Sequence, residues 1–161
     1  MVVYQIYPRS FKDSNGDGIG DINGITEKLD YIKSLGTTVL YLSPIFSSVS
    51  NHKYDTGDYM TVDEMFGGEV ALRSLIYKAK EKGISIILDG VFNHTGDDSL
   101  YFNKYAKYLS AGAYNYDGSK YHDWYTFKNY PDEYESWWGI DIMPKLNQNN
   151  PECRNYFVGE G

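Results

Sequence analysis

Asp89, Asn93 and His94 follow directly after the apolar run at 84–88, which reads Ile-Ser-Ile-Ile-Leu. A carboxylate, an amide and an imidazole gathered where a buried strand ends are typical of the rim of an active site. These residue types could form a metal-binding pair, an acid–base couple or a hydrogen-bonded hub. They could equally form a strand-end network whose polar groups satisfy one another.

A second group of polar side chains places oxygen ligands at every second residue of one short loop. The ligands are the side chains of Asp13, Asn15, Asp17 and Asp21 and the backbone carbonyl of Ile19. This spacing wraps a hard cation, and it predicts a calcium site of structural character. It departs from an EF-hand at the twelfth position, where Gly24 replaces the bidentate Glu. The alternative is an acidic loop of Asx turns without a metal.

The third group is the segment at 52–59, His-Lys-Tyr-Asp-Thr-Gly-Asp-Tyr. It sets the aromatic ring of Tyr54 beside the carboxylate of Asp55, a combination suited to a sugar. On these residues alone, a turn held by Asp55 and Gly57 with Tyr54 packed inward is the preferred interpretation.

The elements that must position these residues alternate between strand and helix. Runs at 2–7, 37–42 and 84–89 predict three strands, and this alternation indicates an α/β fold with a parallel sheet. One helix is expected between the first two strands, with a cap at Asn23, an end at Gly36 and the apolar face Ile25, Leu29, Ile32 and Leu35. A second helix is expected to end at Gly83, with the apolar face Leu72, Leu75, Ile76 and Ala79.

After Thr95 the periodicity is lost, and an irregular excursion of about fifty residues follows. Fourteen aromatic residues lie between Tyr101 and Trp138. They predict either an aromatic core that holds the loops together or a surface on which sugar rings stack, and composition alone favours neither.

The bulk properties narrow the choice of partners. A formal net charge of −7 and a pI near 4.9 leave no basic surface for nucleic acid or for an anionic membrane. No apolar run has the length of a membrane span, and Cys153, the single cysteine, leaves the cellular compartment open. Because Met1 leads at once into a core strand, the chain is expected to be an excised piece.

Four segments together resemble the α-amylase superfamily, glycoside hydrolase family 13. In chain order they are 5–11 with its acidic loop, the region of Tyr54 and Asp55, the stretch at 89–94, and Met-Pro-Lys-Leu-Asn at 143–147. The last segment is similar to the version found in neopullulanases, cyclomaltodextrinases and amylopullulanases, and the acidic loop resembles that of oligo-1,6-glucosidase-like members.

The resemblance implies the first three βα units of a (β/α)8 TIM barrel at 1–94, an inserted domain B at 95–147, and a return toward the barrel at 148–161. It also implies the roles of site residues. Tyr54 would stack on the sugar at the cleaved bond, Asp55 would brace its loop, and His94 would hydrogen-bond the same sugar. Asp89 would orient an arginine near the nucleophile. Asn93 would pin domain B, in some relatives through a second calcium ion.

The resemblance further implies a retaining hydrolase of α-1,4 or α-1,6 glucosidic bonds, whose catalytic Asp, Glu and Asp would fall beyond Gly161. Cleavage needs two carboxyl groups, and no persuasive partner for Asp89 stands in the sequence. The chain alone is therefore expected to be inactive, and to associate with the rest of its barrel or with itself. A non-catalytic glycan-binding module and an α-glucan transferase are the alternatives. A secreted or cell-surface parent is one possibility that these residues do not test.

Overall fold

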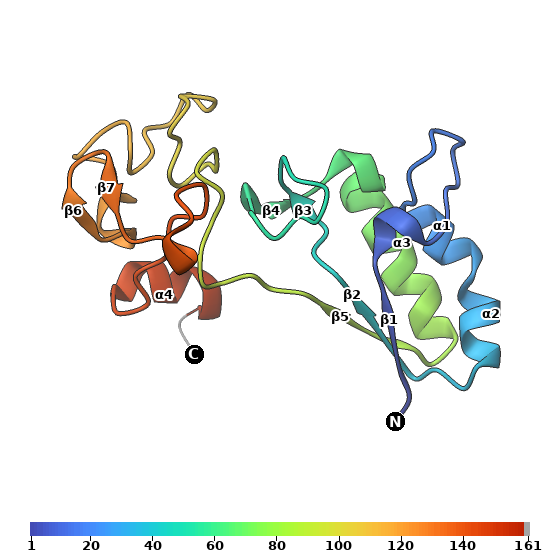
Figure 1. Ribbon diagram of the computed structural model, residues 1–161. Helices are drawn as coiled ribbons and strands as arrows, with labels where there is room; N and C mark the ends of the chain where they lie inside the picture. Colours follow the sequence, from blue (N-terminus) through green and yellow to red (C-terminus); the bar gives the residue numbers. More distant parts are fainter. Residues whose placement is uncertain (160–161) are drawn as a thin grey trace. The chain divides into compact units, whose positions relative to one another are not determined.

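The computed structural model describes residues 1–159, which divide into two compact units (Figure 1). Unit 1 comprises Met1–Ser47 and Tyr59–Gly90, and unit 2 comprises Ser48–Asp58 and the chain from Val91 onward. The assignment of 1–94, 95–147 and 148–161 to barrel, domain B and return stays a prediction, and its last two residues lie outside the described residues.

Unit 1 is built on a three-stranded parallel sheet. Its strands are β1 (Val3–Ile6), β2 (Val39–Leu42) and β5 (Ser85–Leu88), in the order β1-β2-β5. In the register of the sheet, Val39 of β2 pairs with Val3 of β1 and with Ser85 of β5. The three predicted strands and the parallel α/β sheet are thereby confirmed. A small two-stranded sheet of β3 (Phe46–Ser47) and β4 (Asp58–Val62) was not predicted.

The helices of unit 1 are α1 (Ile22–Glu27), α2 (Leu29–Ser34) and α3 (Gly68–Glu81). The single helix expected between β1 and β2 is thus two short ones, separated at Lys28, whose ψ of 5° departs from the helical value. The cap is Asp21 rather than Asn23, because the Asp21 carboxylate accepts a hydrogen bond from the Gly24 N–H at 2.7 Å.

Two residues expected on apolar helix faces are half-exposed. Leu35 lies past the end of α2, and Ile76 lies beside the buried stripe of α3 rather than in it. Gly36 and Gly83 do take the left-handed conformation that ends a helix, with φ of 80° and 65°.

The core of unit 1 is aliphatic apart from Phe66 and lies between the sheet and the helices, which Figure 1 shows together on one side of β1, β2 and β5. Its fully buried members include Ile6, Ile25, Leu40, Leu42 and Leu75. The opposite side of the sheet is open in the described residues, where Val3 and Ile87 are about half exposed.

Unit 2 has little regular structure. It contains the antiparallel pair β6 (Phe127–Asn129) and β7 (Glu133–Tyr134), two single 3-10 turns, η3 (His122–Trp124) and η4 (Trp137–Gly139), and the helix α4 (Pro151–Val158). Its centre is a cluster of buried rings: Tyr101, Phe102, Tyr121, Trp124, Tyr125 and Tyr134. Six of the fourteen aromatic residues at 101–138 are thus buried in a core, which decides between the two interpretations of the aromatic excursion for those rings. Within 1–159, no helix is both long and apolar enough to cross a bilayer.

Candidate functional site

Tyr54 and His94, forty positions apart in the chain, line one cavity within unit 2. The cavity measures about 300 Å3, and its other lining residues are His52, Trp137 and Met143. His94 is almost fully buried, whereas the Tyr54 side chain is 39% exposed. Since four of the five lining residues carry aromatic or imidazole rings and the fifth is a thioether, the cavity suits a flat, weakly polar ligand face.

The loop before Tyr54 is held by its own hydrogen bonds. Lys53 takes a left-handed conformation with φ of 64°, and its ammonium group turns back to donate to the carbonyl of Ser48 at 2.7 Å. The Lys53 N–H donates to the hydroxyl of Ser50 at 3.0 Å, and the Tyr54 N–H donates to Nδ1 of His52 at 3.0 Å. These bonds fix the backbone at Tyr54, so the position of its ring does not depend on a ligand.

His94 ties this loop to the segment at 143–147. Its Nε2 lies 3.1 Å from the carbonyl oxygen of Tyr54, and its Nδ1 lies 3.2 Å from the amide nitrogen of Asn93. An amide that donates to Nδ1 and a carbonyl that accepts from Nε2 both select the neutral tautomer protonated on Nε2. Burial lowers the pKa of His94, although the Tyr54 carbonyl and the charge of Asp55 oppose that shift. A hydrogen bond from His94 to a sugar therefore requires exchange of one of these partners.

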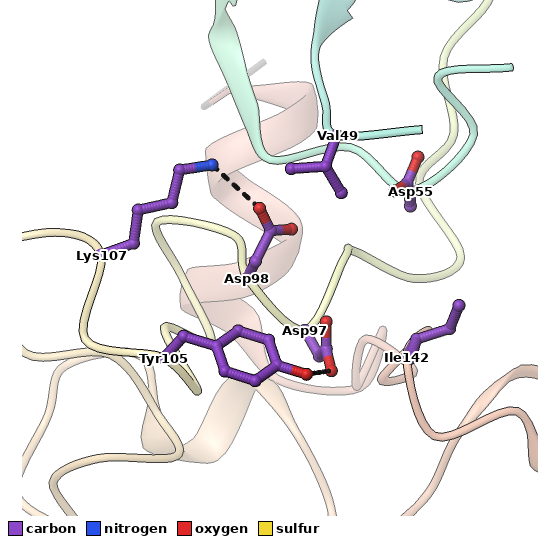
Figure 2. A pocket seen from close by; sticks show the side chains of 7 residues that line it. All are labelled: Val49, Asp55, Asp97, Asp98, Tyr105, Lys107 and Ile142. Atoms are coloured by element: carbon purple, nitrogen blue, oxygen red, sulfur yellow. Dashed lines mark hydrogen bonds and ion pairs between the residues drawn. The ribbon is translucent and has the colours of Figure 1, made fainter. Parts of the chain in front are cut away.

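Asp55 faces a different cavity from its neighbour Tyr54. Its buried carboxylate accepts hydrogen bonds from the hydroxyls of Ser48 and Ser50, which fold the loop around it. Asp55 then lines a cavity of about 740 Å3 within unit 2, shown in Figure 2. Asp55 thus stabilises the loop through its buried carboxylate, while Tyr54 lines the other cavity.

Two further buried carboxylates line the cavity of Figure 2. Asp97 accepts from the Tyr105 hydroxyl at 2.9 Å, and Asp98 accepts from the Lys107 ammonium at 2.9 Å. Burial raises the pKa of Asp97, and the hydrogen bond from Tyr105 opposes it. One oxygen of Asp98 is buried without a hydrogen-bond partner among the described residues. These two residues were not singled out in the sequence, because nothing in the pattern of a loop shows which acids it buries.

Asn93 lies next to His94 in space as well as in sequence, while Asp89 lies in unit 1. The exposed Asn93 keeps the backbone in place through its carbonyl, which accepts from the Leu146 N–H at 2.9 Å. Asp89 follows β5, and its N–H continues the ladder to the carbonyl of Leu42 at 3.1 Å. The structure thus brings Asn93 and His94 together as a hydrogen-bonded hub, and it places Asp89 at the end of its strand as expected.

The acidic loop adopts a chain of side-chain-to-backbone turns. The Asp13 carboxylate accepts from the N–H groups of Asn15, Gly16 and Gly18, and Asp17 accepts from the N–H of Ile19. These bonds, that of Gly18 first, lower the pKa of Asp13.

Asp21 is engaged elsewhere, with Ser14 and with the first turn of α1. Within 1–159, no three His, Cys, Asp or Glu side chains converge as metal ligands. The described loop thus combines Asx turns with exposed oxygens that keep further lone pairs, and calcium binding stays a prediction.

Sequence reasoning missed Trp137 of the Tyr54–His94 cavity, and it gave no role in the site to His52 and Met143, although both lie in segments that it singled out. Trp137 contacts His94 with ring centroids 5.5 Å apart. The adjacent tryptophans at 137–138 in a loop were a usable signal, because loops rarely expose indole rings without a reason. The pairing of 94 with 145 and of 136 with 144, which brings Trp137 to the cavity, is a long-range contact that no local pattern reveals.

The parallel three-stranded sheet of unit 1 with its helices defines the class, an α/β protein built of βα units. The sequence matches the family described as "Alpha amylase, catalytic domain" over residues 5–160. The chain belongs to the α-amylase family, as its motifs predicted.

Several relatives are amylolytic proteins. The chain is 53% identical over 148 residues to an amylopullulanase of Thermoanaerobacterium saccharolyticum, covering 84% of this chain and 12% of that protein. It is 37% identical to an intracellular maltogenic amylase of Bacillus subtilis, covering 98% of this chain and 29% of that protein. The chain thus spans a small part of the relatives that it matches.

Solved structures agree with this assignment. The debranching enzyme of Nostoc punctiforme superposes with a TM-score of 0.86 at 32% identity, covering 98% of this chain and 37% of that one. The type III pullulan hydrolase of Thermococcus kodakarensis superposes with a TM-score of 0.84 at 33% identity, covering 98% of this chain and 34% of that one. The predicted barrel-type fold is thereby confirmed.

Proposed function

We propose that this chain forms part of the glucan-binding cleft of a retaining hydrolase that acts on α-1,4 or α-1,6 bonds of starch, pullulan or maltodextrins. The observation that carries the proposal is the shared cavity of Tyr54 and His94, whose walls are aromatic and whose lining is uncharged apart from the imidazoles. A glucose ring has an apolar face that stacks on such side chains. The names of the relatives, amylopullulanase and maltogenic amylase, supply the substrate class.

Each of the predicted site residues has a separate task in the proposal. Tyr54 stacks on the sugar, and Asp55 braces the Tyr54 loop through Ser48 and Ser50. His94 holds the Tyr54 carbonyl and exchanges that bond for a sugar hydroxyl, while Asn93 fixes the start of the inserted domain B at 95–147. Asp89 orients an arginine near the nucleophile.

The bond-breaking step requires groups that this cavity does not hold. Retaining cleavage uses two carboxyl groups roughly 5–5.5 Å apart on either side of the bond. None of the described residues that line the Tyr54–His94 cavity is an aspartate or glutamate. We therefore place the three catalytic carboxylates outside these 161 residues and expect the chain alone to bind glucan without cleaving it.

Calorimetric titration with maltotriose tests the binding site. Tyr54→Ala should weaken binding by about ten-fold, since it removes the stacking ring, and Tyr54→Phe should retain most of the affinity. The titrations are carried out at protein concentrations at which analytical sedimentation shows a single species. Equal affinity of Tyr54→Ala and the unchanged chain would contradict the proposed site.

Hydrolysis is measured on the same material as reducing ends released from pullulan or soluble starch. Release above background by the pure chain would contradict the assignment of the catalytic acids to residues elsewhere.

We also propose that the acidic loop of unit 1 binds Ca2+ through Asp13, Asn15, Asp17 and the Ile19 carbonyl, with Asp21 as a further ligand. The left-handed glycines at 16 and 18 give the sharp turn that such a loop needs, and the Asx turns already gather the first three side chains. Asp21 would have to exchange its bonds to Ser14. A bound ion would be structural, because it would fix the start of α1.

Thermal melting in a calcium titration tests this loop. A hundred-fold excess over the dissociation constant stabilises the folded state by about 2.7 kcal/mol. Asp17→Asn should reduce the shift, whereas the exposed Asp117→Asn in unit 2 should not. A melting temperature that stays constant in excess calcium would rule out the site.

The open side of the sheet and its edge at β5 support a further part of the proposal, that unit 1 pairs with more of its barrel or with a second copy. Val3 and Ile87 are about half exposed, and a groove of about 460 Å3 beside β5 is lined by Ile76, Ile86 and Leu88 among others. Apolar surface of this kind is usually covered in a folded assembly.

A further inference from the structure

Trp138 combines two unfavourable features. Its side chain is 88% exposed, the most of the three tryptophans, and its backbone is left-handed with φ of 52° and ψ of 26°. A bulky residue in this region is strained, and Gly or Asn would be accommodated better. Exposing an indole also forgoes the free energy of burying it. A strained backbone that holds an indole ring largely in solvent points to a ligand.

The turn that carries Trp138 is fixed from both sides. The Trp137 N–H donates to the carbonyl of Met143 at 2.9 Å, and the Met143 N–H donates to that of Ile140 at 2.9 Å. Ser136 and Pro144 form an isolated β-bridge just outside the turn. The orientation of Trp138 is therefore set by the surrounding backbone.

The ring of Trp138 continues a stack of rings that begins at the Tyr54–His94 cavity. It stacks on Trp137 with centroids 5.3 Å apart and planes 20° apart, and Trp137 in turn lies 5.5 Å from His94. Trp137 is a lining residue of the cavity and Trp138 is not. A chain of ring contacts thus runs from His94 through Trp137 to the exposed indole of Trp138.

We propose that Trp138 is a second stacking platform, which binds the glucose unit next to the one held at Tyr54 and His94. The inference rests on the proposed function, because it needs a glucan in that cavity. A neutral sugar chain fits the surface, since a ring of glucose stacks its apolar face on an indole while its hydroxyls stay in water. Trp138 thereby favours longer oligosaccharides over short ones.

Titration calorimetry with maltose, maltotriose, maltotetraose and maltohexaose tests the platform. Affinity of the unchanged chain should rise with length. Trp138→Ala should remove that rise, with about ten-fold weaker binding of maltohexaose and little change for the shortest ligand that binds. Trp138→Tyr should retain most of the gain. Tyr116→Ala is the matched control, because Tyr116 is an exposed ring of unit 2 that lines no part of the cavity.

Trp138→Gly separates a binding role from a structural one. Glycine accepts the left-handed backbone, so the melting temperature should stay the same or rise while the length dependence disappears. A fall of several degrees would identify Trp138 as a structural residue and overturn the inference.

The two proposals fail in different ways. If the unchanged chain binds none of the oligosaccharides, the proposed function fails and this inference with it. If the chain binds them and Tyr54→Ala weakens binding while Trp138→Ala does not, the proposed binding site at Tyr54 and His94 is supported and the proposed role of Trp138 is wrong.

Discussion

The core of unit 1 is almost entirely aliphatic and lies between regular elements, whereas that of unit 2 is aromatic and lies among turns. Leu75 in unit 1 and Phe102 in unit 2 are both fully buried. Leu75 belongs to a helix of fourteen residues that packs on a sheet, while Phe102 belongs to no helix or strand. The rings of Tyr114, Tyr125, Phe127 and Tyr134 surround Phe102 with centroids 4.7–6.1 Å away.

The difference shows what replaces secondary structure in an irregular segment. Helices and strands satisfy their own backbone groups, so their side chains need only fill space. Turns leave those groups to side chains, as where Asn103 serves both the N–H and the carbonyl of Tyr108. Large rigid rings then fill the uneven space that turns enclose. The candidate sugar site lies in the unit built this way, in agreement with the general placement of binding residues on loops.

The largest expected effects come from truncating the two cores. Phe102→Ala should destabilise unit 2 by about 3–5 kcal/mol, and Leu75→Ala should destabilise unit 1 by about 2–5 kcal/mol. Since α1, α2 and α3 hold most of the helical residues and are in unit 1, while unit 2 holds the ring cluster and only the short helix α4, the variants should act mainly on different signals. Phe102→Ala should lower the denaturant midpoint in near-ultraviolet circular dichroism, and Leu75→Ala the midpoint of the helical signal.

Tyr116→Ala, at an exposed ring of unit 2, serves as the control and should shift neither midpoint appreciably. Identical shifts of both signals in both variants would show that the two cores unfold as one. The two units would then not differ in their free energy of unfolding.

A smaller effect is expected at Asn103, which is buried and left-handed with φ of 54°. Its amide donates to the carbonyls of Tyr108 and Ser110 at 3.0 and 2.9 Å. Asn103→Ala leaves both without that donor and puts a less suitable residue at positive φ, so it should cost about 2–3 kcal/mol in chemical denaturation.

Asn103→Gly isolates the hydrogen bonds, because glycine tolerates the backbone, and it should cost less than Asn103→Ala. Asn129→Ala, at the exposed end of β6, is the matched control and should be nearly neutral. A neutral Asn103→Ala would show that the turns of unit 2 do not depend on side-chain hydrogen bonds.

Local patterns were sufficient for the parallel sheet and the helix ends of unit 1, but not for the small sheet of β3 and β4. The apolar runs predicted the parallel strands, and Gly36 and Gly83 predicted the helix ends, because periodicity and left-handed glycines are properties of neighbouring residues. The misassigned cap at Asn23 and the helix break at Lys28 are errors of a residue or two. They arose because several polar residues near a helix start can cap it, and only the backbone angles select one.

The sequence by itself also determined the family, since four motifs in a fixed order have little chance of arising together, and the match over residues 5–160 agrees. Only the tertiary structure decided which polar and aromatic residues share a cavity. Tyr54 and Asp55 are neighbours in sequence yet line different cavities, and Trp137 reaches His94 through pairing between distant segments. The physical reason is that an irregular chain has no period that fixes side-chain direction, so long-range hydrogen bonds and ring packing determine which residues meet.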